Sequence, residues 1–253
     1  MCRILIFFSI IILFSSCAKE LDTDATDRAK KQYQLNRSFY PLGVSNAWTY
    51  QIDSVYYTRS LSTIVRDTVT GIYRDSIADS SYDQNGKSVY RILHQRFTNS
   101  TDWETLKVFT ITDDSLFLLM TLDNVSLVEL VFPFARFTSW DPYTFTDKNR
   151  NFLIRTNRIQ LYSNMLESVI TDSVQTEILG QLTPMITVAD GDFDDHLVSR
   201  QYSARTYGAG IGLVRKKQEF YSDQTTLDAT VAWEQKAEAG FSMQMTLLHY
   251  HVR

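Results

Sequence analysis

From Ser45 onward, the chain alternates apolar and polar residues with a period of two, which is typical of β-strands that bury one face. In the first such stretch, Trp48, Tyr50 and Ile52 share one side. The alternation slips at Asp53-Ser54, which predicts a β-bulge or a strong bend in a long strand. Further strands are predicted over residues 62–70, 89–97, 103–112 and 115–122.

Turn signals separate these stretches. Asp83-Gln84-Asn85-Gly86 contains Asn-Gly, which tolerates the positive φ angles of a type I′ hairpin, and Thr112-Asp113-Asp114 carries paired turn-forming aspartates. Short turns join antiparallel strands, because a parallel pair needs a crossover of about a dozen residues. The pattern therefore predicts an all-β fold: a single antiparallel curved sheet that closes into a barrel or half-barrel, lipocalin-like in shape.

One stretch allows two interpretations. Apolar residues between Arg158 and Ile170 recur at helical spacing, so a helix is an alternative there. We prefer strand-loop-strand, because β-type alternation resumes from Thr171 to Leu179.

The first residues have the pattern of an export signal. A cationic start at Arg3 precedes eleven residues, Ile4 to Phe14, that are apolar except for Ser9. This run is too short for a membrane-spanning helix, which needs about 20 apolar residues. Ser15-Ser16-Cys17 resembles the lipobox of bacterial lipoproteins, in which the cysteine is acylated and becomes the first residue. The alternative is an uncleaved anchor with a free thiol at Cys17.

The chain accordingly divides into a lipoprotein signal peptide (1–16), a lipid-anchored flexible tether (17–35) and an antiparallel β domain (36–253). A short helix around residues 28–35 is compatible with the composition of the tether. The acidic residues just after Cys17 resemble the signal that sends lipoproteins of Bacteroidetes-type bacteria to the cell surface, although a solvated linker has the same composition. We expect the bacterial outer membrane, with the cell surface favoured over the periplasmic face.

Composition excludes two kinds of chemistry. Cys2 and Cys17 are the only cysteines, so the processed chain would have no thiol left for a disulfide, a metal site or a nucleophile. The formal net charge is -4 and the sequence has no basic cluster, which argues against nucleic acid as a partner.

The sequence also contains an internal echo. Tyr40-Pro41-Leu42 precedes Trp48 by the same spacing at which Phe132-Pro133-Phe134 precedes Trp140. The echo allows a fold of two related halves, although repeat architectures normally show several periods. In either case Trp48 and Trp140 are predicted to be buried anchors of two strands.

Three stretches carry a wider resemblance. They are Tyr40 to Tyr50, with its aromatic-Pro-Leu and Trp-x-Tyr, Gly191 to Leu197, with Gly-x-Phe-x-x-x-Leu, and Tyr207 to Val214, with Tyr-x-x-Gly-Ile-Gly-Leu-Val. These stretches and the lipobox resemble a group of uncharacterised exported lipoproteins of Bacteroidetes-type bacteria. The resemblance implies a curled antiparallel sheet and no activity.

The glycines of the last stretch also suggest a phosphate-binding loop. A dinucleotide fingerprint must open a helix, however, and Leu213-Val214 continues as a strand. We therefore expect Gly208, Gly210 and Gly212 to have structural roles, at a bulge or a close approach of strands.

An acidic cluster, Asp192, Asp194, Asp195 and His196, offers cation ligands. Its spacing is wrong for a calcium loop, and we expect a turn followed by a strand with Asp194 and His196 facing water. The remaining histidines, His94, His249 and His251, form no metal-binding motif. No metal site, cofactor or catalytic residue is assigned.

Aromatic residues make up 13% of the chain, more than a minimal core needs. They either line an apolar cavity inside the curved sheet or fill a solid core, and the sequence leaves both open. The function we expect is that of a membrane-anchored envelope lipoprotein, non-enzymatic, that binds an apolar small molecule or a protein partner. The alternatives are a hydrolase using Asp192 or Asp194, and a purely structural envelope component.

Overall fold

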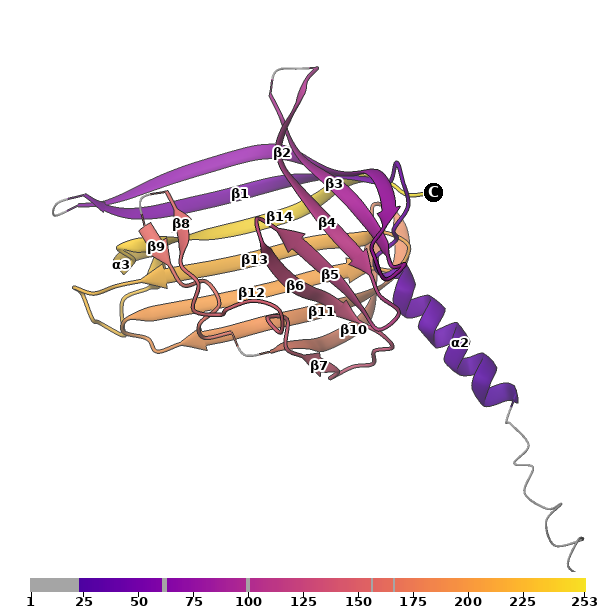
Figure 1. Cartoon of the computed structure of the whole chain (residues 1–253). Coiled ribbons are helices and arrows are strands. Elements are labelled where there is room, and N and C mark those ends of the chain that lie inside the picture. The colour runs from indigo at the N-terminus through magenta and orange to yellow at the C-terminus, as the bar shows by residue number, and fades with distance from the viewer. Residues whose placement is uncertain (1–22, 61–62, 99–100, 156, 166) are drawn as a thin grey trace, which may run out of the picture.

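The computed structural model describes residues 23–60, 63–98, 101–155, 157–165 and 167–253. Twelve strands form one sheet in the order β6-β5-β4-β3-β2-β1-β14-β13-β12-β11-β10-β7, and β8 pairs with β9 in a second, two-stranded sheet (Figure 1). Every pairing in both sheets is antiparallel.

The elements have the following bounds: α2 (Thr23–Ser38), β1 (Ala47–Ser60), β2 (Thr63–Tyr82), β3 (Ser88–Phe97), β4 (Trp103–Asp113), β5 (Phe117–Leu122), β6 (Val125–Val131), β7 (Ser139–Trp140), β8 (Phe152–Ile154), β9 (Asn157–Ile159), β10 (Ser168–Ile178), β11 (Gln181–Asp194), β12 (Ser199–Gly208), β13 (Gly212–Ser222), α3 (Trp233–Lys236) and β14 (Ala239–His251).

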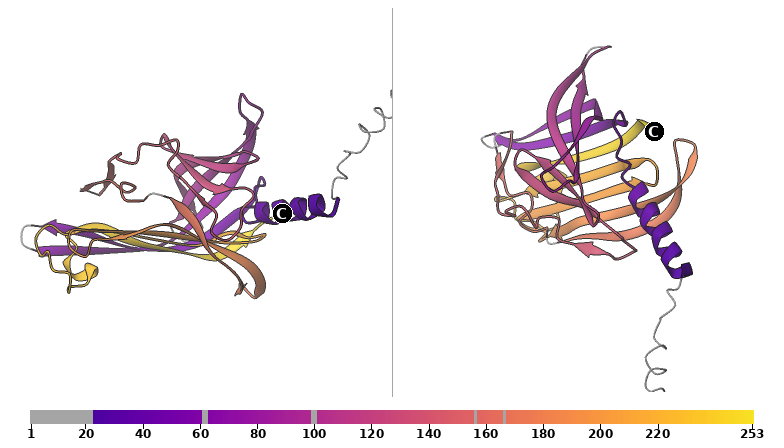
Figure 2. Two further views of the ribbon diagram at one scale, coloured as in Figure 1. Left: turned by 90° about the horizontal axis from the view of Figure 1, so that it is seen from below. Right: turned by 45° about the vertical axis from the view of Figure 1, so that its right-hand side comes forward.

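The sheet curls until its two edges nearly meet. Strands β3 to β6 turn over one face of the long strands β1 and β11 to β14, as Figure 2 shows. At the gap, the backbone N–H of Val128 on β6 donates to the carbonyl of Pro142 at 2.9 Å. The indole Nε1 of Trp140 on β7 donates to the carbonyl of Val128 at 3.0 Å. The predicted antiparallel sheet, nearly closed into a barrel, is confirmed.

The slip in β1 has a different cause from the predicted bulge. Asp53 and Ser54 pair continuously with β14, and the only irregularity of that pairing lies between Thr49 and Tyr50. The apolar side changes because Tyr57 packs on the convex face of the sheet against Tyr221 and Trp233. The predicted bulge at Asp53-Ser54 is therefore wrong. The apolar residues of β1 change sides here because a second small core, covered by α3, lies on the other face of the sheet.

The ambiguous stretch after residue 158 is strand-loop-strand, as predicted: β9 ends at Ile159, turns follow, and β10 begins at Ser168. The tether prediction needs a correction, because its described part, from Thr23, is helical and belongs to α2. Helix formers such as Ala, Lys, Gln and Arg explain the helix. The rest of the tether, Cys17 and the signal peptide lie outside the described residues, and the division of the chain into these segments stays a prediction.

The last turns of α2 dock on one end of the barrel. The hydroxyl of Tyr33 donates to the carbonyl of Ser115 at 2.9 Å, and Arg37 forms an ion pair with Asp113. The side-chain oxygen of Asn36 accepts the backbone N–H of Phe134 at 3.0 Å. These contacts fix the C-terminal end of α2, while its N-terminal end extends away from the barrel (Figure 1).

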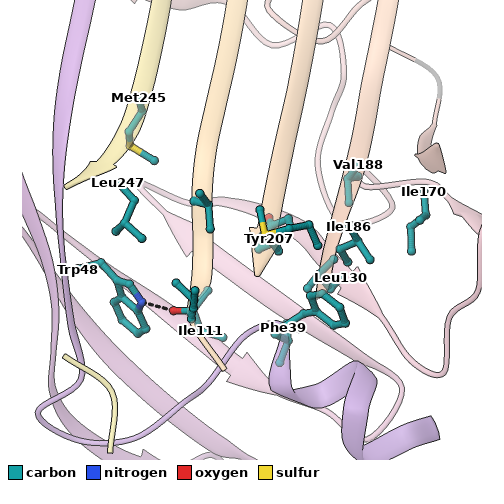
Figure 3. Close-up of a cluster of buried hydrophobic side chains, with 14 of the residues drawn as sticks. Phe39, Trp48, Ile111, Leu130, Ile170, Ile186, Val188, Tyr207, Met245 and Leu247 are labelled. Carbon is teal, nitrogen blue, oxygen red and sulfur yellow. Dashed lines mark hydrogen bonds between the residues drawn. The ribbon is translucent and has the colours of Figure 1, made fainter. Parts of the chain in front are cut away.

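The main core fills the barrel at this α2 end (Figure 3). It combines the residue after the helix, Phe39, with inward residues of strands from both halves of the sheet, such as Ile111, Leu130 and Val188. Trp48 lies in it, 6% exposed, and its indole N–H donates to the carbonyl of Ile211.

The echo does not mark equivalent units. Trp48 begins a fourteen-residue strand in the middle of the sheet, whereas Trp140 ends a two-residue strand at its edge. Trp140 is partly buried and packs against the rim of the main core. The two tryptophans therefore share a local pattern and occupy different places in the fold.

Gly208, Gly210 and Gly212 lie at the tight turn between β12 and β13. We expect Gly212→Ala to lower the free energy of unfolding by about 2 to 3 kcal/mol. Gly212 has φ 99°, and an added Cβ would lie 3.1 Å from Nε1 of Trp48. Gly210 has φ 72° with nothing within 4 Å of such a Cβ, so Gly210→Ala should cost only about 1 kcal/mol. Urea unfolding of both variants measures the difference. Equal losses would show that the approach of Trp48 contributes nothing.

Candidate functional site

Beyond the main core, the inward positions of three neighbouring strands change from apolar to charged. Val188 is followed two residues later by Asp190 on β11, and Val214 by Lys216 on β13. On β12, Arg205 lies two residues before Tyr207. Because residues two apart in a strand share a face, a charged layer directly follows the apolar one inside the barrel.

Two β-bulges supply the carboxylates of this layer. The register between β11 and β12 runs from Ala189 to Gly191 and skips Asp190. The register between β5 and β6 likewise skips Glu129. A bulged residue can be re-aimed relative to its neighbours, and both side chains are buried, 6% and 7% exposed.

Arg205 joins the two carboxylates. Its Nε lies 2.9 Å from Oδ2 of Asp190, its Nη2 2.5 Å from Oδ1 of the same residue, and its Nη1 2.6 Å from Oε2 of Glu129. The remaining acceptor sites are used by neutral donors: Ser168 and Ser203 donate to Asp190 at 2.7 and 3.0 Å, and Tyr207 donates to Glu129 at 2.5 Å. We call Glu129, Asp190 and Arg205 the charged trio.

Electrostatics keep this arginine charged. Burial by itself would lower the pKa of Arg205, but the neighbouring carboxylates of Asp190 and Glu129 outweigh that effect and hold its pKa well above its ordinary value. Burial also raises the pKa of Tyr207, so its hydroxyl stays protonated and keeps donating to Glu129. Arg205 therefore stays charged beside its two carboxylate partners, and the formal charges of the three side chains sum to minus one.

Lys216 lies directly opposite Arg205 in the pairing of β12 with β13. Its side chain makes no hydrogen bond or ion pair with any residue that the structure describes, and it is partly exposed. Burial lowers the pKa of its ammonium, although the charges of Glu129 and Asp190 act in the opposite direction. Among the described residues, Lys216 is thus the cation of the charged layer that has no hydrogen-bond or ion-pair partner.

The layer forms the floor of an inner cavity of about 180 Å³, with Glu129, Asp190, Arg205 and Lys216 among its lining residues. An outer cavity of about 370 Å³ adjoins it. Five residues line both cavities: Met120, Leu122, Leu127, Leu161 and Tyr162. The outer cavity adds further apolar walls, the cations Lys107 and Arg150 and the carboxylate of Asp123. We call the two adjoining cavities together the chamber, which is polar at its floor and mostly apolar above it.

The segment between β7 and β10 supplies the outer wall. Figure 2 shows this segment, with β8 and β9, on the same side of the long strands as β3 to β6. Its aromatic side chains pack on one another: the rings of Tyr143 and Tyr162 have centroids 4.7 Å apart, and Phe152 meets Tyr162 edge-on at 5.1 Å. Burial raises the pKa of both tyrosines, so these walls stay neutral.

The acidic cluster lies outside this chamber. β11 ends at Asp194, and a turn follows in which the carboxylate of Asp195 accepts the N–H groups of Leu197, Val198 and Ser199. The predicted order, a turn followed by a strand, is therefore wrong: the strand comes first and the turn follows it. His196, with φ 61°, is exposed as predicted.

The prediction that Asp194 faces water is wrong. Its side chain is 19% exposed and is held by Nη1 of Arg200 at 3.1 Å and by the indole N–H of Trp233 at 3.1 Å. Burial alone would raise the pKa of Asp194, but hydrogen bonds from the backbone of His196 and from Trp233 outweigh this and lower it. Arg200 also lies 3.3 Å from Asp192. A carboxylate held ionised in this way is unsuited to the general acid that a hydrolase would need.

The other histidines are scattered. Nδ1 of His94 lies 2.6 Å from Asp75, and its ring stacks on Tyr73. His249 and His251 are exposed near the end of β14. Within the described part of the chain, no group of three or more His, Cys, Asp or Glu side chains is placed to hold a metal ion.

Sequence reasoning missed the charged trio and Lys216 entirely. One signal was present: Glu129 interrupts an otherwise apolar run from Leu127 to Val131. An ionisable residue at that place in a strand is rarely buried unless it is paired. Its partners on β11 and β12 are far away in sequence, and nothing in the local pattern of either strand identifies them.

No helix in the described ranges is long and apolar enough to cross a membrane. No protein-family profile matches the chain, and no curated protein is significantly similar to it in sequence.

Two solved structures are similar to it. One, from Bacteroides fragilis NCTC 9343, is described as "a putative exported protein with YmcC-like fold" and has a TM-score of 0.42 and 9% identity. The other, from Parabacteroides distasonis ATCC 8503, is described as "a putative lipoprotein" and has a TM-score of 0.37 and 10% identity. Each comparison covers 84% of this chain and 98% of the other. Neither similarity assigns a function to this chain.

We expect Arg205→Met to lower the free energy of unfolding by about 3 to 5 kcal/mol, because it leaves two buried carboxylates without their cation. Arg215→Met is the matched control: Arg215 is exposed on β13, so its loss should change stability by no more than about 0.5 kcal/mol. Urea denaturation followed by tryptophan fluorescence measures both. An Arg205→Met protein as stable as the control would contradict the assignment of the trio as a buried ionic tie.

Proposed function

We propose that this protein is a lipid-anchored protein of the bacterial envelope that holds an apolar ligand in the chamber of its barrel. The observation that supports binding most directly is the chamber itself, two adjoining cavities of about 180 and 370 Å³ with five lining residues in common. Ligand sites are typically concave and mostly apolar, with a small number of placed polar groups. Here the apolar walls belong to β5, β6 and the segment before β10, and the polar groups lie on the floor.

The walls support the first of the two interpretations that the aromatic content left open, an apolar cavity inside the curved sheet. The aromatic and aliphatic residues at the α2 end pack into a continuous core, whereas those around Leu127 and Tyr162 line open space. The barrel is therefore solid at one end and hollow beyond it. A purely structural component would have no need of the hollow part.

Anchoring rests on the lipobox-like Ser15-Ser16-Cys17. With Cys17 acylated, α2 would follow the anchor closely and separate it from the barrel. A helix of sixteen residues is about 24 Å long at 1.5 Å per residue. Its fixed C-terminal end would hold the barrel clear of the lipid surface, at the outer membrane and on the cell surface.

We expect Cys17→Ser to release the protein from membranes without unfolding it, because the lipid provides the anchoring and the core begins beyond α2. Fractionation of a bacterial host that expresses the full chain, with a carbonate wash of the membrane pellet, measures the release. Circular dichroism of the released protein checks the fold. A variant that stays in the washed pellet would show that the apolar segment remains attached and that the lipobox interpretation is wrong.

Leu127 lines both cavities, so Leu127→Trp should fill part of the chamber and weaken ligand binding at least about tenfold. The probe is N-phenyl-1-naphthylamine, a neutral apolar dye that fluoresces when it leaves water. Leu182→Trp is the control, since Leu182 is 71% exposed and lies outside the chamber. Equal dye binding by both variants and the unaltered protein would contradict the proposal. Independently of the dye, native mass spectrometry of detergent-extracted protein would identify any ligand that co-purifies.

A further inference from the structure

We propose that the ligand of this chamber is an amphiphile with a carboxylate head, and that Lys216 binds that head at the floor while the apolar chain extends along the upper walls. This inference rests on the proposed function and adds the chemical class of the ligand. It follows from which polar groups of the floor are still free to bind.

The acidic groups of the floor are occupied. Both oxygens of Asp190 and both of Glu129 already accept hydrogen bonds or ion pairs from Arg205 and from neutral hydroxyl groups. At Asp190, where each oxygen already accepts two bonds, a cationic or donor head would have to replace one of them. Such a replacement is unfavourable, because the displaced donor would then be left unpaired in the interior.

The cationic groups are unequal. Arg205 uses Nε, Nη1 and Nη2 on the two carboxylates, so it presents no free fork to a ligand. Lys216 has no protein partner for a hydrogen bond or an ion pair within the described residues. Its ammonium has three donors and also offsets the net negative charge of the trio.

Two neighbours reinforce this preference for an acceptor. The hydroxyl of Tyr162 and the side-chain amide of Gln218 line the same inner cavity and have no hydrogen-bond partner among the described side chains and backbone. Both groups can donate as well as accept, so together with the ammonium of Lys216 they offer several donors to an acceptor head. A carboxylate, which only accepts, is the head that satisfies them, and its charge makes these hydrogen bonds stronger than those of a neutral head.

The remainder of the ligand is constrained by the walls. Leu122, Leu127 and Leu161 line both the inner and the outer cavity, and Phe152 and Ile154 add apolar surface to the outer one. A carboxylate on a linear hydrocarbon chain matches this order of polar floor and apolar walls. Small polar acids match only the floor and would leave the walls uncovered.

The test compares decanoate with 1-decanol, which share a chain and differ in the head, by displacement of N-phenyl-1-naphthylamine near neutral pH. The unaltered protein should bind decanoate at least about tenfold more tightly than decanol, the range of a charge-assisted hydrogen bond. Lys216→Met should remove that preference while still binding decanol. Lys217→Met is the matched control: Lys217 lies next in β13, exposed on the other face, and its loss should leave the preference unchanged.

The outcomes separate the two proposals. Equal binding of decanoate and decanol by the unaltered protein would overturn the carboxylate assignment alone. A preference for decanoate that survives in Lys216→Met would overturn the role of Lys216 and place the head near Lys107 and Arg150 instead. If neither compound displaces the dye and Leu127→Trp does not change dye binding, the ligand-binding function itself would be overturned.

A pH titration of the unaltered protein tests the assignment without any substitution. Burial lowers the pKa of Lys216, so the preference for decanoate should disappear, as pH rises, below about 10.4, the ordinary lysine value. The charged groups that act on Lys216 are Glu129 on β6, Asp190 on β11, Arg205 on β12 and Asp75 on β2. Burial raises the pKa of Tyr143 and Tyr162, so these phenols stay neutral while Lys216 loses its proton. A preference for decanoate that persists above about pH 10.4 would contradict the role of Lys216.

Discussion

The interior of the barrel is organised by one buried arginine. Arg205 on β12 reaches Asp190 on the neighbouring strand and Glu129 on β6, which comes from the opposite edge of the sheet. A buried charge is stable only when it is paired and hydrogen-bonded, so each carboxylate requires this arginine and the arginine requires both. The trio therefore ties β6, at one edge of the twelve-stranded sheet, to β11 and β12 near the other edge, beside the hydrogen bonds that join β6 to β7 and to the segment after β7.

This tie also fixes where the apolar core ends. On the α2 side of Arg205, inward residues such as Val188 and Val214 pack with Trp48 and Phe39 into a continuous core. On the other side, a cover of apolar side chains over the charged layer would bury Lys216, which has no hydrogen-bond or ion-pair partner among the described residues. The space above it stays open, with Lys216 facing it, and the strands continue as the walls of a chamber. Core and chamber are consecutive layers of one sheet, separated by the trio.

The sequence predicts the architecture well because strand alternation and turn chemistry are local. The period-two pattern identified β1, β3, β4 and β5 closely, and the Asn-Gly and Asp-Asp turns specified antiparallel order. The same local reasoning failed where a partner on another element decides the outcome. The pattern in β1 slipped because Tyr57 packs under α3, and Asp194 is held by Arg200 and Trp233, which no short motif connects to it.

The candidate site was hidden for the same reason. Glu129 and Arg205 are 76 residues apart, as the contact between the side chain of Arg205 and the Glu129 carbonyl makes explicit. Their meeting depends on the closure of the sheet and on two bulges, and a bulge shifts register by one residue without leaving a clear mark in composition. What sequence can supply is the anomaly of an acid within an apolar strand, and only the fold supplies its partner.

The saturation of the trio bears on which chemistry the chamber can serve. An acid-base pair for hydrolysis needs a carboxyl group that can carry a proton and face the substrate, with a second carboxylate across a cleft. Glu129 and Asp190 instead point their oxygens at Arg205 and at hydroxyl donors, so neither carboxylate is directed at a substrate in the chamber. Lys216 faces the chamber without such a partner, among neutral phenols and apolar walls. A floor built in this way favours holding an anionic head in place over transferring protons to it.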